Sequence, residues 1–134
     1  MTRMNRVGLL VVAFAAVFFV ACSHGPLKVD AIQLGRALNS DKSIATHVTR
    51  FKPDQTVYVA VLTDGPGTGE IAARWTFGGR VISEEKKSVS YTQGAATEFH
   101  INYAGGFPPG DYKVELLVDG KPAETRGFHI EPQD

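Results

Sequence analysis

Between Lys28 and the C-terminus, apolar residues recur at every second position in short stretches that turn-forming residues separate. The clearest stretch, 55–63, places three residues on one face: Val57, Val59 and Val61. Strict alternation indicates a half-buried β-strand, because successive side chains of a strand point to opposite faces. About seven such strands, with turns at roughly ten-residue spacing, are typical of an antiparallel sandwich. The sequence therefore predicts one all-β domain over residues 28–134.

Glycine, proline and aspartate mark the ends of the expected strands. Gly78-Gly79 and Asp119-Gly120 are two-residue hairpin signals, since hairpin turns need residues that tolerate positive φ. Residues 64–69 are expected to form a longer, glycine-rich loop. The expected strands cover residues 32–38, 44–51, 55–63, 71–77, 80–90, 97–103, 112–118 and 123–130.

Two features of these strands predict their surroundings. Trp75 alternates with Ala73 and Phe77 and is expected on the inward face, because a large aromatic side chain buries most area in the core of a sandwich. The Glu-Glu-Lys-Lys run at 84–87 is expected on a solvated edge strand, where charges prevent strand-to-strand aggregation.

The N-terminal residues have the pattern of an export signal. Arg3 and Arg6 are the charged residues of the first short segment, and 7–20 is then apolar or glycine throughout. Such a segment is too short to span a bilayer comfortably, which favours a cleaved signal over a transmembrane helix. It ends on Phe-Val-Ala before Cys22, the single cysteine of the chain. This arrangement resembles the lipobox of a bacterial lipoprotein signal.

The resemblance implies that residues 1–21 are removed and that Cys22 is acylated, becomes the first mature residue and attaches the protein to the membrane. Residues 22–27 would then form a short tether with a reach on the order of 20 Å. By similarity to known sorting patterns, Ser23 after the cysteine favours the periplasmic face of the outer membrane. We therefore expect a lipid-anchored protein of the cell envelope.

The charge balance limits the partners. The chain has 14 basic and 14 acidic residues, and removal of Arg3 and Arg6 with the signal lowers the basic count by two. A nearly neutral domain has no strong electrostatic attraction for nucleic acid, so no nucleic-acid partner is expected. With Cys22 acylated, no thiol remains for a disulfide, a metal site or a nucleophile. The domain would depend on burial alone for its stability.

No set of residues has the spacing of a catalytic or metal site. The histidines of the late strands, His100 and His129, alternate with core residues and are expected to face solvent rather than to converge on a metal. The chain has no Gly-x-Ser-x-Gly motif, and the glycine-rich segment 65–69 lacks the lysine and the helix of a phosphate-binding loop. We therefore expect no enzyme activity, no metal and no cofactor.

Three local patterns are similar to those of immunoglobulin-like and fibronectin type III-like domains: Trp75 on an early central strand, the Asp119-Gly120 hairpin before the last strand, and Gly110-x-Tyr112-x-Val114 at the start of the strand before it. The chain also resembles small bacterial envelope lipoproteins of unassigned function, through residues 51–54, 73–75 and 109–114. The inter-sheet cysteine pair of antibody domains is missing, because valines lie on the strands that would carry it: Val59 and Val114. The resemblance implies an immunoglobulin-like antiparallel β-sandwich and implies no activity.

The loop Phe107-Pro108-Pro109 is the candidate contact site. Phe107 either caps an open end of the core or is exposed as a contact surface, since loops on a rigid sandwich often carry recognition. Two functions are compatible with this pattern. The first is a non-enzymatic accessory of envelope assembly that acts through an envelope protein partner. The alternative is a periplasmic module that binds a glycan or another small ligand on exposed aromatic residues, with candidates Phe107, Tyr91 and Tyr58.

Overall fold

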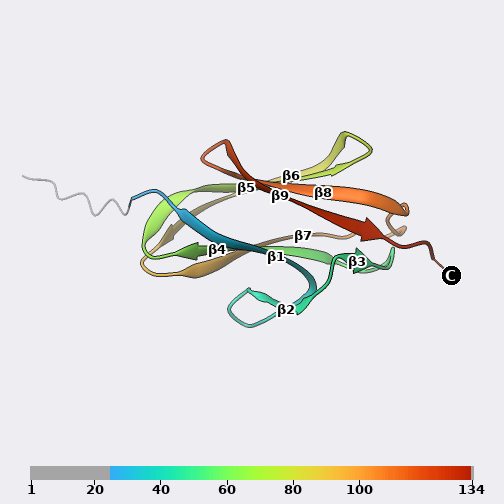
Figure 1. The fold of residues 1–134 in the computed structure, drawn as a ribbon, viewed down its shortest axis with the longest axis horizontal. Helices are drawn as coiled ribbons and strands as arrows, with labels where there is room; N and C mark the ends of the chain where they lie inside the picture. The colour runs from blue at the N-terminus through green and yellow to red at the C-terminus, as the bar shows by residue number, and fades with distance from the viewer. Residues whose placement is uncertain (1–24, 134) are drawn as a thin grey trace, which may run out of the picture.

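The computed structural model describes residues 25–133, and in this range the chain forms strands and no helix (Figure 1). The predicted signal peptide 1–21 and the predicted lipidation site Cys22 lie outside the described residues, as do Ser23 and His24. The strands are β1 (Lys28–Leu38), β2 (Ile44–His47), β3 (Arg50–Phe51), β4 (Val57–Asp64), β5 (Gly67–Phe77), β6 (Arg80–Tyr91), β7 (Ala95–Ile101), β8 (Gly110–Val118) and β9 (Lys121–Ile130).

The strands form two sheets that pack face to face. One sheet has the order β2-β1-β4-β7, and the other has the order β3-β9-β8-β5-β6. All neighbours are antiparallel except β3 and β9, which are parallel. The predicted all-β sandwich is therefore confirmed. The predicted edge position of the charged run 84–87 is also confirmed, because β6 is the last strand of the larger sheet.

The segment 44–51 is two strands and not the single strand that its pattern predicts. β2 pairs with β1 in the smaller sheet, whereas β3 pairs with β9 in the larger one. The chain changes sheets at Val48-Thr49, and this crossing covers the side of the sandwich opposite β6 and β7 (Figure 1). The inward-facing positions shift at the crossing, because Ile44 is buried on β2 and Phe51 is buried on β3, an odd number of residues later. The local pattern does not show which sheet either half joins, since that depends on pairing with distant strands.

Backbone pairing also moves several other predicted boundaries. Residues 67–69, predicted as loop, belong to β5 because they pair with the end of β6, from Gly67 opposite Tyr91. Tyr103, predicted on the same strand as Ile101, follows β7 and is exposed, because β4 offers no partner beyond Val57. The backbone N–H of Thr68 donates to the carbonyl oxygen of residue 25, at 3.0 Å, so the folded part begins before residue 28.

Leu27 belongs to the folded domain and not to the tether in which the sequence places it. Its side chain is buried and is part of the hydrophobic core, and Pro26 bridges to Thr68 on β5. A lone leucine before the first alternating stretch gives no periodic signal, and so its burial depends on a contact with β5 that the local pattern does not show.

Both predicted hairpin turns are confirmed. Gly78 and Gly79 connect β5 to β6 with φ of 59° and 77°, and Asp119 and Gly120 connect β8 to β9 with φ of 52° and 78°. Positive φ at both central residues is the geometry of a type I′ turn, whose twist matches that of the flanking strands.

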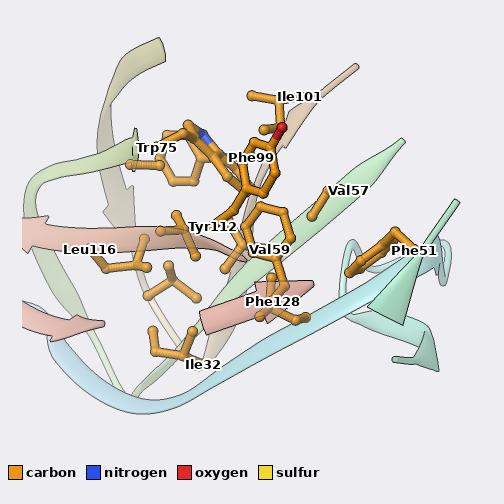
Figure 2. Packing of buried hydrophobic residues seen from close by; sticks show 14 of the residues in the cluster. Ile32, Phe51, Val57, Val59, Trp75, Phe99, Ile101, Tyr112, Leu116 and Phe128 are labelled. Atoms are coloured by element: carbon orange, nitrogen blue, oxygen red, sulfur yellow. The ribbon is translucent and has the colours of Figure 1, made fainter. Parts of the chain in front are cut away.

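The core lies between the two sheets and receives side chains from both (Figure 2). Trp75 is 1% exposed, which confirms its predicted inward position, and its ring meets the edge of Phe128 at 5.8 Å between centroids. Val59 and Val114 are fully buried in opposite sheets, where antibody domains place their disulfide. Apolar packing between the sheets therefore takes the place of that covalent link.

Candidate functional site

A concavity of about 400 Å³ opens at one end of the sandwich. We call this end distal: β5 ends there, β6 begins, β7 ends and β8 begins, whereas the chain enters at the opposite, proximal end next to Thr68 (Figure 1). The residues that line this distal concavity are Phe77, Ile82, Ser83, Ile101, Asn102, Tyr103, Phe107, Pro108 and Tyr112. Its volume lies at the lower end of the range of small-molecule sites.

The large hydrophobic residues that are exposed among residues 25–133 gather around this concavity. They are Val81, Ile82 and Tyr103, with 56%, 44% and 58% of their surfaces exposed. Ile82 and Tyr103 line the concavity, and Val81 is adjacent to Ile82 in the chain. Single exposed apolar residues are common on proteins, but a cluster beside an apolar hollow marks a contact surface.

A bulge in β6 brings Ile82 to this position. Ser83 pairs with Trp75 and Val81 pairs with Thr76, so Ile82 is an additional residue between two ladder pairs. Bulges are frequent at sheet edges and beside binding sites, where they change the direction of a side chain. Sequence reasoning missed Ile82 because its role depends on the pairing of β5 with β6, and the only signal is two adjacent β-branched apolar residues just after a hairpin turn.

Phe107 caps the distal end of the core. It is 6% exposed, its ring meets the edge of Tyr112 at 5.9 Å, and its backbone N–H donates to the carbonyl oxygen of Pro53 at 2.8 Å. The core-capping interpretation of Phe107 is therefore confirmed. Pro108 and Pro109, the other residues of the predicted contact loop, are exposed, and Pro108 lies on the wall of the concavity.

Tyr112 holds the aromatic wall in place. Its ring stacks on Phe77 at 4.2 Å and on Phe128 at 5.3 Å, and its hydroxyl donates to the carbonyl oxygen of Pro108 at 2.6 Å. A tyrosine near the start of a strand that bonds to backbone a few residues upstream is the tyrosine corner of immunoglobulin-type sandwiches. Burial raises the pKa of the Tyr112 phenol above its usual value, because the charged form is poorly solvated there.

Gly110 allows this stack to form. Its φ is 142°, and a Cβ atom at this position would lie 3.0 Å from the Phe77 ring. A larger residue at this position would therefore adopt an unfavourable backbone conformation, and its Cβ atom would clash with the Phe77 ring.

The open side of the sandwich lies between β6 and β7, the edge strands of the two sheets. Near the proximal end the Tyr91 hydroxyl is 2.6 Å from that of Thr97. Midway, the ammonium group of Lys87 donates to the carbonyl oxygen of Glu98 and lies 4.9 Å from the centre of the Phe99 ring. No hydrogen bond or ion pair among the described residues bridges the two strands beyond Glu98, and there the seam widens into the distal concavity.

The distal concavity is neutral. Its lining contains no charged side chain, and the side chains of Ser83 and Asn102 in it make no hydrogen bond to other described residues. A charged group placed there would lose hydration without gaining a counter-ion. The site therefore suits an uncharged, largely apolar occupant that offers one or two polar groups.

The other predicted site residues are dispersed. The ring of Tyr58 lies 5.5 Å from that of His100, and Tyr91 is on the seam near the proximal end, so neither shares a surface with Phe107. His100 contacts Glu98 at 3.0 Å. His129 similarly contacts Asp111 at 2.8 Å, and no group of three or more potential metal ligands occurs between residues 25 and 133. The same range contains no helix that could cross a membrane.

Comparisons with known proteins give a fold and no family. No protein-family model matches the chain, and no curated protein matches its sequence. An immunoglobulin-like protein from Pseudomonas aeruginosa has a similar structure, with a TM-score of 0.56 at 9% identity over 81% of this chain and 98% of that one. The fold is immunoglobulin-like. An alkylpurine DNA glycosylase from Pseudomonas fluorescens, solved with DNA, is similar with a TM-score of 0.53 at 13% identity, over 81% of this chain and 31% of the glycosylase.

We expect Tyr112→Phe to destabilise the immunoglobulin-like domain by about 1–2 kcal/mol at neutral pH, because the Pro108 carbonyl loses its donor. The raised pKa means that the folded state favours the neutral phenol. This contribution is present below the ordinary tyrosine pKa of about 10 and is lost as the pH rises through the folded-state value. Urea denaturation should therefore show that the free energy of unfolding of Tyr112→Phe is lower than that of the wild type, and that this difference becomes smaller at alkaline pH.

Tyr103→Phe is the matched control, because Tyr103 is exposed and its hydroxyl has no hydrogen-bond partner among the described residues. It should change the free energy of unfolding by less than about 0.5 kcal/mol. If Tyr112→Phe lowered the free energy of unfolding as little as the control does, the hydrogen bond from Tyr112 to the Pro108 carbonyl would not stabilise the distal end.

Proposed function

We propose that this protein is a lipid-anchored accessory of the bacterial cell envelope, which acts without catalysis by contacting an envelope protein through its distal concavity. The observation that carries the proposal is the gathering of exposed apolar residues around a neutral hollow at one end of a rigid sandwich. Recognition sites are often found on loops and edges that a rigid scaffold positions.

The anchoring part of the proposal depends on the lipobox-like segment that ends at Cys22. The fold adds a consequence: Cys22 precedes Gly25 by three positions, and the backbone at residue 25 is bonded to β5. Three extended residues reach about 10 Å. An acylated Cys22 would therefore hold the proximal end close to the bilayer and leave the distal end directed away from it.

The proposal of a non-enzymatic role is supported by what surrounds the candidate site. The lining of the distal concavity contains no acid, base or nucleophile other than the hydroxyls of Ser83 and Tyr103 and the buried Tyr112. General acid–base and nucleophilic catalysis need a positioned partner that activates such a hydroxyl. No histidine, lysine or carboxylate lines the concavity to do this.

The alternative function, binding of a glycan or another small ligand, is favoured by one observation. Four aromatic side chains line the distal concavity: Phe77, Tyr103, Phe107 and Tyr112. This is a different aromatic set from the predicted one, of which it keeps only Phe107. Of these four, Tyr103 alone is widely exposed, whereas sugar-binding platforms present several ring faces, so a protein contact is the better supported function.

Anchoring is tested by Cys22→Ala. We expect the variant to incorporate no labelled fatty acid and to be either unprocessed or soluble, because the chain has no other cysteine to acylate. Metabolic labelling and fractionation measure both effects. Fatty acid that is still incorporated into the variant would contradict the lipobox assignment.

The protein contact is tested by a photo-crosslinking residue at Tyr103, in cells with an intact envelope, and by the same residue at Thr125 as a control. Thr125 is also exposed, but it lies on the long strand β9, away from the concavity lining. We expect a reproducible protein adduct from position 103 that position 125 does not give. Adducts to lipid alone, or equal protein adducts from both positions, would contradict the proposal.

A further inference from the structure

We propose that the distal concavity receives one uncharged aromatic or branched side chain from a short extended segment of the partner. This segment pairs as an added strand with the free edge that the end of β7 forms with the residues after it, 100–103. The inference rests on the proposed function, because it specifies the chemistry of the partner at the same site. Strand addition to a sheet edge is a general mode of peptide recognition, in which backbone bonds give affinity and side-chain pockets give specificity.

The free edge of β7 is available at its distal part only. β7 is the last strand of its sheet, and β4 occupies its other side. At Glu98 the edge carbonyl already accepts a hydrogen bond from Lys87, which blocks an incoming strand at that point. The backbone N–H and C=O groups of every second residue point to the same edge of a strand. Because the Glu98 carbonyl points to the free edge, the backbone groups of His100 and Asn102 point there too.

The register of an added strand directs one side chain into the concavity. Residues directly opposite each other in an antiparallel pair have their side chains on the same face of the sheet. Ile101 faces the interior and lines the concavity. The partner residue opposite Ile101 would therefore point into the same hollow, between β7 and the bulge at Ile82 on β6.

The lining determines which side chain fits. All of its residues are uncharged, and the walls are aromatic or aliphatic except at Ser83 and Asn102. A lysine, aspartate or glutamate of the partner would be desolvated without a counter-ion, whereas a phenylalanine or leucine would gain apolar contacts. The free side chains of Ser83 and Asn102 can bond to polar backbone groups of the incoming segment.

Two other occupants fit less well. A second copy that paired through β6 would meet a bulge and a strand with the charged run 84–87, and both features oppose edge-to-edge pairing. A membrane lipid is disfavoured because the distal concavity would lie far from the bilayer. β6 has 12 residues, which corresponds to a strand length on the order of 40 Å, and an anchor at Cys22 holds the other end of the sandwich at the bilayer.

The test uses the full lipidated chain in detergent micelles, labelled for NMR, and a soluble probe peptide. In this peptide threonine and valine alternate, lysine is at both ends and phenylalanine is at the centre. We expect shifts to concentrate at four backbone positions: Ile82, Ser83, Asn102 and Tyr103. A peptide with aspartate at the centre, and one with methylated backbone nitrogens along one edge, should bind at least about tenfold more weakly, which corresponds to about 1.4 kcal/mol.

Matched variants localise the binding without disturbing the fold. Ile82→Ser should weaken binding of the phenylalanine peptide by about tenfold, because an apolar wall of the pocket is removed. Leu62→Ser should leave affinity within about twofold, because Leu62 is a partly exposed aliphatic residue on β4 that does not line the concavity. Equal effects of the two substitutions would overturn the proposal.

Three further measurements separate the other occupants. N-acetylphenylalanine amide that binds as tightly as the peptide would make the concavity a small-molecule site and overturn strand pairing. Self-association in sedimentation without peptide would overturn the proposal in favour of a second copy. Binding of phospholipid vesicles with the same NMR shifts would overturn it in favour of lipid. Peptide binding at these positions without a protein adduct from Tyr103 in cells would contradict the proposed function and leave the docking site standing.

Discussion

Tyr112 is the side chain on which the distal end of this sandwich depends. It stacks between Phe77 and Phe128, meets Phe107 edge to face and donates its hydroxyl to the Pro108 backbone. One side chain therefore connects the core, the end of β5 and the loop that follows β7. Since the chain has no disulfide within the described residues, apolar packing holds the two sheets together, and this aromatic stack forms one wall of the concavity.

The two ends of the domain differ in how they are closed. At the proximal end, turns, the Leu27 contact and the Tyr91–Thr97 bond seal the sandwich. At the distal end, the seam between β6 and β7 stays open, and exposed apolar residues surround the opening. This asymmetry gives the proposed anchor and the proposed contact separate places, one at each end. In this arrangement the proposed contact end would be free to meet a partner while the proposed anchor held the other end at the membrane.

The sequence could predict what depends on local periodicity and turn chemistry. Alternation located most strands and the inward position of Trp75, and the glycine and aspartate pairs located both type I′ turns. Phe107 could be singled out from its loop, because an aromatic residue in a loop either packs on the edge of the core or marks a contact surface. Its burial was one of two interpretations that the sequence left open.

What the sequence could not predict depends on pairing between distant segments. The division of 44–51 between two sheets, the bulge at Ile82 and the block of the β7 edge by Lys87 all result from contacts across the fold. The concavity itself is formed by residues from the ends of four strands and one loop, and no single stretch contains its pattern. Three of its four aromatic residues were therefore not predicted as site residues.

If the two ends of the domain have different tasks, the lipidated protein takes one orientation on a bilayer, and measuring that orientation is the most direct test. A fluorophore would be attached through Pro66→Cys at the proximal end or Arg80→Cys at the distal end, both exposed positions in a chain whose one native cysteine is the proposed acylation site. Quenching by lipids with a nitroxide on the headgroup would then be measured in vesicles. We expect strong quenching at position 66 and little at position 80. Equal quenching, or stronger quenching at position 80, would contradict the proposed division between an anchored end and a contact end.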